Sequence, residues 1–530
     1  MEIDSISLEL NRLSEAVGLG QFDEALNGAD ILYQEVIDGT ERNALFFTII
    51  SNIASIFIDV GHMKPSVDSA RKGLDILDEH KDEIIEQIGE DAYFYNLSNA
   101  KSSLISEKNP FKRTFSTIEQ LVEIKTDLWK AIRSFKHTNA GKTEPTYIVN
   151  LGNSLKQQFR IAEAIECYDL VNSLNRDIPQ SWLNRSETLI MLNTVSTTFS
   201  IQMLEQIKNG YKNVLSSKEI PPTWVDYYKK QVAFWQNKVS EVCKEAEIEP
   251  DLHDSEKTKA EYDELSSYRR FCLDNNLSLS EHGLYCPCVG SSRDNLTIPT
   301  AGGVVGDFVI PMEMVLNRLK SEFSFARQLY FEYFTTEKDY ELLHDSCFSE
   351  LLNDELLGVD VERLRTAFRL CFGILDKIAI AICELFDLYP PNRKVYFQSF
   401  WQLDRDNRRE LFNRHKNPGL LALYSIATDL NERKDGEWSF LKQLRNDLEH
   451  AFVVVHKSDN PSDIYNSYKF MDDIVFIKED DFIEHLERLL QLTRSAIFSF
   501  VFTVRDKALN KKKDRAIYLP NSIHPQDYIF

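Results

Sequence analysis

The residues best suited to chemistry in this chain lie together in the segment 445–450, which reads RNDLEH. Arg445 carries a permanent cation, and His450 carries an imidazole that titrates near neutral pH. Residues five apart on a helix lie about 140° around its axis and about 7.5 Å along it. The long Arg445 side chain can therefore lean toward His450, and Asn446 borders the same strip of surface.

A cation beside an imidazole suits cleavage of RNA by its own 2′-hydroxyl group, a reaction that needs no metal. His450 could remove the 2′-hydroxyl proton or protonate the leaving 5′-oxygen. Arg445 could hold the phosphate by paired hydrogen bonds and stabilise the charge of the transition state. Asn446 could orient one of them or contact the phosphate. We predict these three as catalytic residues, with no metal and no cofactor.

A structural interpretation of the same segment stays open. Arg445 and Glu449 are four residues apart, the spacing of an ion pair on a helix surface, which contributes only a few tenths of a kcal/mol. His450 could equally be a partly buried histidine with satisfied hydrogen bonds. Spacing alone therefore does not distinguish catalysis from a surface salt bridge.

The net charge of −22 restricts how RNA could bind, because proteins that coat a phosphate backbone are usually basic. Any RNA contact should be small and local, and the acidity suits protein partners at least as well. We predict Lys442, His456 and Lys457 as RNA-binding residues, with Lys511, Lys512 and Lys513 as further candidates at the rim. The alternative is that each is a solvated surface charge.

Two further patterns are weaker. Cys272, His282, Cys286 and Cys288 are residue types that bind zinc, but paired Cys-x-x-Cys knuckles are absent and the spacing of Cys286 and Cys288 is tight. The glycine-containing segment 301–306 lacks the Lys-Ser/Thr of a phosphate-binding loop. We adopt neither as a site.

The composition predicts an all-α fold, since 19 Gly and 16 Pro in 530 residues are too few for an all-β chain rich in turns. Eight scattered cysteines argue against a disulfide scaffold. The chain begins without a basic and apolar signal segment, and the apolar run 45–60 is interrupted by polar residues. We therefore expect a cytoplasmic protein that does not bind membranes.

A repeat is visible in the segment 145–190. Pro145 and Pro179 are 34 residues apart, as are Asn150 and Asn184, with Gly152 and Tyr168 at the positions of small and large packing residues; this period resembles the tetratricopeptide repeat. Phe159 departs from that pattern where the family prefers glycine at the turn between helices, and Arg176 where it prefers proline.

Weaker echoes of the repeat occur upstream, in the segments 18–26 and 61–77. We predict a helical solenoid of roughly five to six helix pairs over residues 1–245; a generic helical bundle is the alternative. Residues 246–310 are predicted as a linker and an ordered but irregular connector, since they keep Leu284, Tyr285 and Ile298.

Residues 311–510 are predicted to form a helical bundle, and 511–530 a tail. Apolar residues recur at helical spacing in five stretches. These begin near Pro311, near Leu364, at Pro418, at Ser439 and near Asp480, and the fourth is expected to run to His456.

The C-terminal half resembles the HEPN superfamily, in a form found behind tetratricopeptide repeats in bacteria. The motifs are YRRFCL from Tyr268, Arg293-Asp294, LNRLKSEFSFARQLYFE from Leu316, FGILDKIA from Phe372 and RNDLEH from Arg445. The resemblance implies a dimeric ribonuclease in which two such helices face each other across a cleft. It also implies RNA products with a 2′,3′-cyclic phosphate, and a role as a toxin or in antiviral defence.

The leading hypothesis is therefore a metal-independent endoribonuclease whose repeat half senses a protein or peptide trigger in its groove. A second hypothesis is a non-catalytic dimeric adaptor that binds protein partners through both halves, which the acidity favours. A third is that the HEPN half is the target of nucleotide transfer by a separate antitoxin enzyme.

Overall fold

The computed structural model describes residues 3–39, 41–64, 66–198, 200–220, 222–245, 247, 255–300, 303–337, 355–457 and 474–513. Within them the chain is helical apart from loops and one two-stranded sheet, which confirms the all-α prediction. The chain forms two compact units. Unit 1 comprises Met1–Ile190 and Glu205–Ser240, and unit 2 comprises Met191–Leu204 and Glu241–Phe530.

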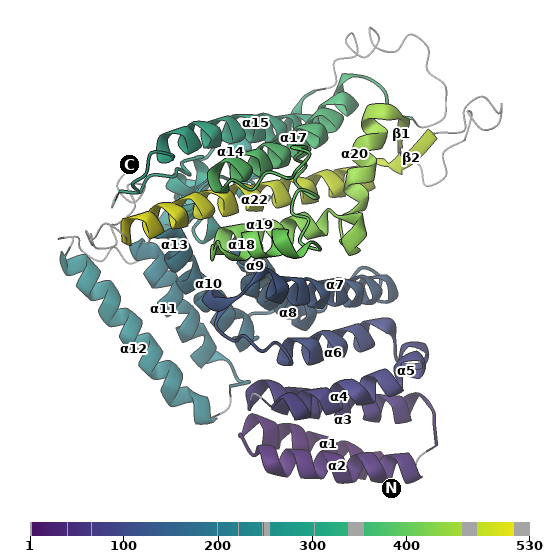
Figure 1. Ribbon diagram of the computed structural model, residues 1–530. Helices are drawn as coiled ribbons and strands as arrows, with labels where there is room; N and C mark the ends of the chain where they lie inside the picture. Colours follow the sequence, from purple (N-terminus) through teal and green to yellow (C-terminus); the bar gives the residue numbers. More distant parts are fainter. Residues whose placement is uncertain are drawn as a thin grey trace. The chain divides into compact units, whose positions relative to one another are not determined.

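Helices of unit 1 pack in consecutive pairs (Figure 1). The pairs are α1 (Ile3–Gly18) with α2 (Phe22–Gly39), α3 (Ala44–Met63) with α4 (Val67–Glu79), α6 (Glu90–Ser103) with α7 (Phe115–Thr138), and α8 (Pro145–Gln157) with α9 (Ile161–Leu174). The other elements up to residue 245 are α5 (Lys81–Gln87), η1 (Pro110–Lys112), α10 (Pro179–Ser196), α11 (Ile201–Ser216) and α12 (Pro222–Glu245). This pairing is consistent with tetratricopeptide repeats.

The turn between α8 and α9 explains the departure at Phe159. Its φ of 60° lies in the left-handed region that favours glycine, the residue that the repeat prefers there. Burial of the ring, which is 2% exposed, offsets the backbone strain. Gly152 has the packing role expected of it, because a Cβ there would lie 2.8 Å from the Tyr168 ring.

Helix α3 contains the apolar run at residues 45–60. By length and composition it is apolar enough to cross a membrane, so the argument from its polar interruptions was wrong. Its placement identifies it instead as a core helix, since 67% of its most apolar window is buried inside the structure. Phe46, Ile50, Ile53 and Phe57 all belong to the core of unit 1.

Most elements of unit 2 form a bundle of helices. They are α13 (Ser255–Asp263), α14 (Ser267–Asp274), η2 (His282–Leu284), η3 (Val289–Ser292), α15 (Val309–Thr335), α17 (Val359–Phe386), α18 (Asp406–Asn413), α19 (Pro418–Asp429), η4 (Glu432–Lys434), α20 (Phe440–His450) and α22 (Glu479–Lys513). Two strands, β1 (Phe452–His456) and β2 (Ile474–Lys478), pair in parallel.

Helix α22 forms the centre of this bundle, packed against α15, α17 and α19 (Figure 1). The apolar face predicted on α17 is buried as expected, from Leu364 through Phe368 to Leu385. At Gly419 the backbone of α19 approaches α22 so closely that a Cβ would lie 2.5 Å from the Ser499 carbonyl oxygen. The close packing of α19 on α22 supports the segment that leads into α20.

Buried arginines hold the connector of residues 275–300 against this bundle. On α22, Arg494 Nε donates to the Ser278 carbonyl at 2.9 Å, and Arg505 Nε donates to the Ile298 carbonyl at 3.2 Å. On α15, Arg327 Nη1 donates to the Leu277 carbonyl at 2.6 Å. Residues 275–300 contain no α-helix or strand, only the short helices η2 and η3, whereas α13 and α14 form regular helices earlier in the segment predicted as linker and connector.

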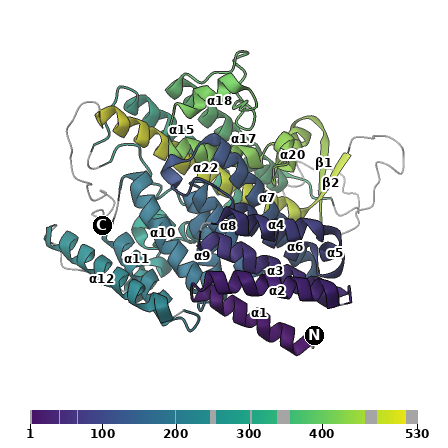
Figure 2. The same ribbon diagram turned by 60° about the horizontal axis from the view of Figure 1, so that its bottom comes forward.

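One predicted helix is too long. We expected a helix from Ser439 to His456, but α20 ends at His450 and Phe452–His456 is strand β1. The β-branched run Val453-Val454-Val455 favours extended backbone, and pairing with β2 satisfies its hydrogen bonds. Figure 2 shows both strands beside α20.

Some predicted features lie outside the described residues. They are Ala301 and Gly302, the tail residues 514–530, and the side chains of Lys511, Lys512 and Lys513.

Candidate active site

Helix α20 presents the RNDLEH segment. Leu441 and Leu444 are buried and attach one face of the helix to unit 2. The chain leaves the helix immediately after His450, because Ala451 is extended with φ −125° and ψ 176°. His450 is exposed at this last helical position, and Asn446 is half-buried one turn earlier.

The Arg445 guanidinium lies over α17. Its central carbon is 5.6 Å from the centroid of the Phe372 ring, a distance at which a cation and an aromatic face attract each other. Its Nε atom is buried and has no hydrogen-bond partner within the described part of the chain. An aromatic ring thus orients Arg445, and its guanidinium forms no hydrogen bond or ion pair among the described residues, so its Nη atoms can serve as donors to a phosphate.

Asp376 on α17 supplies a negative charge near this guanidinium. Burial raises the pKa of Asp376, and a backbone hydrogen bond from Phe397 at 2.8 Å, together with the charges of Arg445, Lys377 and Lys442, opposes the rise. The positive charges of Arg445 and Lys442 on α20 therefore both act on the Asp376 carboxyl group of α17.

The surface salt bridge considered for Arg445 does not form among the residues that the structure describes. Glu449 instead faces Arg369 on α17, with 3.9 Å between Glu449 Oε1 and Arg369 Nε. The i,i+4 explanation for Arg445 therefore does not apply in this structure.

Sequence reasoning missed the basic residues of α17. Arg369 lies beside α20, and Arg365 Nη2 donates to the Val453 carbonyl of β1 at 2.6 Å. Their signal in the sequence is ERLRTAFR from Glu362, with arginines one helical turn apart. We interpreted that segment only for its apolar face, because nothing local shows which helix it will face.

The predicted RNA-binding residues occupy three different environments. Lys457 is exposed just after β1. His456 is 5% exposed, and its ring centroid lies 6.3 Å from that of Phe476 on β2. Lys442 lines a cavity of about 710 Å³.

We call this cavity the basic groove. Its charged lining residues are Lys394, Arg405, Arg433, Lys434 and Lys442 against Asp404 and Glu432, and its aromatic lining residues are Tyr396, Trp401 and Tyr424. Asp376 accepts a hydrogen bond from the N–H of Phe397, which lies between the lining residues Tyr396 and Gln398 in the sequence, and the lining residue Lys442 acts electrostatically on the same carboxyl group. Because its basic lining residues outnumber the acidic ones, the basic groove should attract anions although the whole chain is acidic.

The loop from η4 to α20 sets where α20 begins. Trp438 N donates to the Asp429 carbonyl at 2.8 Å, and a Cβ at Gly436 would lie 2.2 Å from the Thr428 carbonyl oxygen. We expect Gly436→Ala to displace this loop and to lower the free energy of unfolding by about 1–3 kcal/mol.

Chemical denaturation would measure this loss. Gly373→Ala on α17 is the control, because the nearest atom to its added Cβ is Lys377 Nζ at 3.9 Å. It should stabilise the helix by about 0.5–1 kcal/mol. Equal stability of the two variants would contradict the role given to the Gly436 loop.

A second cavity, of about 720 Å³, lies within unit 1. Its lining includes the carboxamides of Asn99, Asn150, Asn153 and Asn184. Asn150 Nδ2 donates to Asn99 Oδ1 at 2.9 Å. Carboxamides both donate and accept hydrogen bonds, so this wall suits the backbone of an extended peptide.

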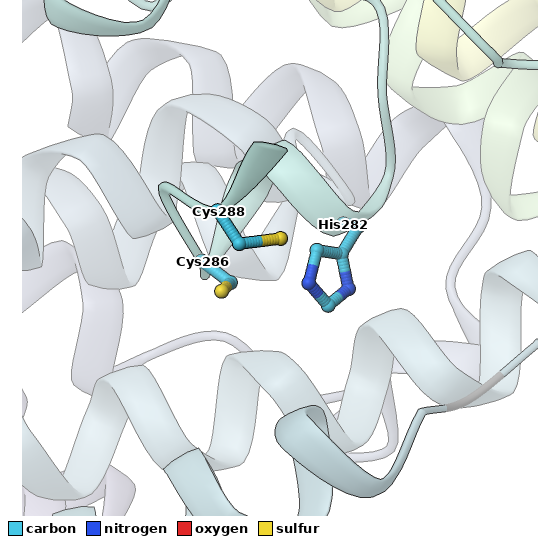
Figure 3. A group of neighbouring side chains, drawn as sticks. All are labelled: His282, Cys286 and Cys288. Atoms are coloured by element: carbon cyan, nitrogen blue, oxygen red, sulfur yellow. The ribbon is translucent and has the colours of Figure 1, made fainter. Parts of the chain in front are cut away.

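Three of the four residues weighed as zinc ligands come together. The ligand atoms of His282, Cys286 and Cys288 all lie within 4.8 Å of one another (Figure 3). Cys272 is not part of this group; it is buried on α14 near Arg327 and Asp294.

Comparison with protein families identifies the bundle. Residues 305–507 match the LA2681-like HEPN family, a span that includes α15, α17, α20 and most of α22. The C-terminal part of the chain therefore carries a HEPN domain, as the motifs indicated. No tetratricopeptide family matched the N-terminal helices. No curated protein matches the chain.

Proposed function

We propose that unit 2 is a metal-independent endoribonuclease of the HEPN type. The observation that carries the proposal is the setting of Arg445, held over Phe372 with its Nε unpartnered among the described residues, five residues before the exposed His450 in a HEPN domain. The HEPN superfamily is generally associated with ribonuclease activity.

The reaction is internal transesterification. The ribose 2′-oxygen attacks the adjacent phosphorus, the P–O5′ bond breaks, and the products carry a 2′,3′-cyclic phosphate and a 5′-hydroxyl. His450 either removes the proton from the attacking 2′-hydroxyl group or protonates the leaving 5′-oxygen. Arg445 donates hydrogen bonds to the phosphate oxygens as their charge grows, and Asn446 orients the phosphate.

A homodimer would complete this site. HEPN ribonucleases are expected to place two such helices across a shared cleft, which doubles the positive charge in a small volume. Phe452, two residues after His450, is 62% exposed. A second copy facing α20 would cover it.

The repeats of unit 1 are the proposed sensor. An extended peptide or a protein segment would bind the carboxamide wall of its cavity and change the activity of the nuclease. Such regulation suits a cytoplasmic toxin or an effector of antiviral defence, which must stay inactive until triggered.

The substrate RNA would run through the basic groove, where phosphates meet lysines and arginines and a base stacks on the exposed Tyr396. Reversing two exposed charges, by Lys394→Glu with Arg433→Glu, should weaken binding of single-stranded RNA. It should also reduce the slope of log affinity against log salt by about 1 for each phosphate that the groove no longer binds.

Binding to a 2′-O-methyl RNA, which cannot be cleaved, separates affinity from reaction. The matched control is Arg414→Glu with Lys416→Glu, two exposed charges of unit 2 that do not line the groove. Equal affinity and equal salt slope for the two double variants would exclude the groove as the RNA path.

The ribonuclease activity itself can be tested by cleavage of an RNA in which one ribose lacks its 2′-hydroxyl group. RNA incubated with the full chain should yield 2′,3′-cyclic ends, and a 2′-deoxy sugar at the mapped cleavage position should stop the cut there. Because the nuclease is proposed to be gated, growth inhibition on expression in bacteria is a second readout. Intact RNA together with normal growth would reject the proposal.

The acidity of the chain favours one competing function, a non-catalytic adaptor that binds protein partners. In that case alanine at Arg445 would leave function intact, whereas substitutions in the unit 1 cavity would abolish it.

A further inference from the structure

The connector between α14 and α15 holds a compact cluster of soft ligands. His282 begins η2, Cys286 follows one helical turn later, and Cys288 directly precedes η3. The Cys288 sulfur and the imidazole point into the same space, with the Cys286 sulfur beside them (Figure 3). His282 and Cys286 are 8% and 3% exposed, and Cys288 is half-buried.

The backbone holds these residues together without any ligand. Cys286 N donates to the His282 carbonyl at 3.0 Å, which closes the turn between them. Ser291 N donates to the Cys288 carbonyl at 3.0 Å, which fixes the next turn. The arrangement is therefore a property of the folded connector.

The tight Cys-Pro-Cys spacing proves compatible with chelation. A residue before proline is driven toward extended backbone, and Cys288 is itself extended with φ −72° and ψ 172°. Residues two apart on extended backbone project their side chains to the same side. An extended backbone through Pro287 is therefore consistent with both thiols lying within 4.8 Å of the His282 ligand atom.

His282 has the second contact that metal-binding histidines have. Its Nδ1 lies 3.1 Å from the Tyr285 hydroxyl, and that hydroxyl lies 2.8 Å from Ser200 Oγ. A hydrogen bond at Nδ1 sets the ring orientation and leaves Nε2 as the nitrogen for a metal.

We propose that His282, Cys286 and Cys288 bind one zinc ion, with water as the fourth ligand. Zinc–sulfur bonds of about 2.3 Å and zinc–nitrogen bonds of about 2.0–2.1 Å place tetrahedral ligand atoms about 3.5–3.8 Å apart. The ligand atoms already lie within 4.8 Å of one another, so closure onto the ion needs movement of about 1 Å.

Charge balance supports this ligand set. Two thiolates and a neutral imidazole around Zn²⁺ give a complex without net charge, which can be buried at little electrostatic cost. A fourth ligand that is neutral keeps this balance, whereas a carboxylate would leave a buried negative charge. Thiolate ligands also favour zinc over magnesium or calcium.

The ion would tie the connector to the bundle. Glu281, next to His282, pairs with Arg505 of α22 at 2.6 Å, and Thr198 Oγ1 donates to its other carboxylate oxygen at 2.7 Å. Fixing residues 282–288 therefore fixes a carboxylate that joins α22 to the segment Met191–Leu204 of unit 2. We assign the zinc a structural role, independent of RNA cleavage.

Metal content of the full chain, purified without a histidine tag from zinc-supplemented medium, tests the site. Wild-type protein should hold about one zinc per chain, and Cys286→Ser with Cys288→Ser should fall below about a tenth of an equivalent. The control Cys167→Ser alters a half-buried thiol of unit 1 and should keep its zinc.

Cobalt substitution keeps the test decisive if the double variant fails to fold. Wild-type protein loaded with Co²⁺ should show thiolate-to-cobalt absorption and the intense visible bands of a tetrahedral site. Less than about a tenth of an equivalent of zinc after reconstitution, or a Cys286–Cys288 disulfide in the intact mass, would overturn the proposal. Neither result depends on ribonuclease activity, so each proposal can fail alone.

Discussion

Arg445→Ala is expected to lower the rate of RNA cleavage by about 10²–10³-fold, the usual effect of losing one donor that stabilises transition-state charge. The loss should appear mainly in kcat, because the charge on the phosphate grows only as the 2′-oxygen attacks. Folding should be nearly unchanged, since Arg445 Nε makes no hydrogen bond within the described chain.

His450→Ala should have at least as large an effect, because general acid–base catalysis contributes about 10²–10⁴-fold. The double variant should be little worse than either single variant, since the two residues act on one transition state. Arg445→Lys should recover only part of the rate, because an ammonium cannot make paired hydrogen bonds to phosphate.

The measurements are single-turnover cleavage of a labelled RNA and growth inhibition on expression. Arg414→Ala and His137→Ala are matched controls, because each removes an exposed side chain of the same type that is not part of α20. Cleavage by Arg445→Ala and His450→Ala at the wild-type rate would support the adaptor instead.

Arg327→Ala is expected to be the most destabilising substitution, at about 3–5 kcal/mol, because it removes a buried cation and the main ionic partner of the largely buried Asp294 carboxylate. Arg327 is 1% exposed, and its Nη2 donates to Asp294 Oδ2 at 2.6 Å. Its Nη1 binds the Leu277 carbonyl and its Nε binds Tyr268 Oη at 3.1 Å, so one side chain joins α15, α14 and the connector.

Urea unfolding of the full chain would measure this loss, and Arg414→Ala gives the comparison. The Arg414–Glu410 pair is exposed, with side chains 66% and 73% accessible, so its removal should cost about 0–1 kcal/mol. Similar midpoints for the two variants would contradict the structural role of Arg327.

The same pair predicts a pH dependence. Burial alone would raise the pKa of Asp294, but hydrogen bonds and charge from Arg327, with the Leu279 N–H, hold it below its ordinary value. Asp294 therefore contributes its full stabilisation above its pKa in the unfolded chain, about 3.9. That contribution is lost as the pH falls through its lower pKa in the folded chain. Stability should thus fall more steeply below about pH 4 in wild type than in Asp294→Asn.

The contacts of Arg327 distinguish motifs that stabilise the fold from the motif proposed to be catalytic. Tyr268, Arg293-Asp294 and the segment around Arg327 carried the HEPN resemblance together with RNDLEH. The structure joins Tyr268, Asp294 and Arg327 in one partly buried hydrogen-bonded cluster, so these motifs hold the connector on the bundle. RNDLEH instead lies on α20, whose last residue, His450, is exposed.

Local patterns in the sequence were sufficient for much of the fold. Apolar residues at helical spacing located α15, α17, α19 and α22, because each must bury one face to be stable. The repeat period located the helix starts at Pro145 and Pro179. The motif residues Arg445, Asn446 and His450 were identifiable for the same reason, since they lie within one short helix.

Contacts between segments far apart in the chain required the tertiary structure. Phe372 and Asp376 meet Arg445, and Arg369 meets Glu449, only because α17 packs beside α20. The strand β1 was mistaken for helix because its parallel partner lies beyond an intervening segment. The turns within residues 282–288 bring His282 and the two thiols together locally, whereas Cys272 lies apart on α14.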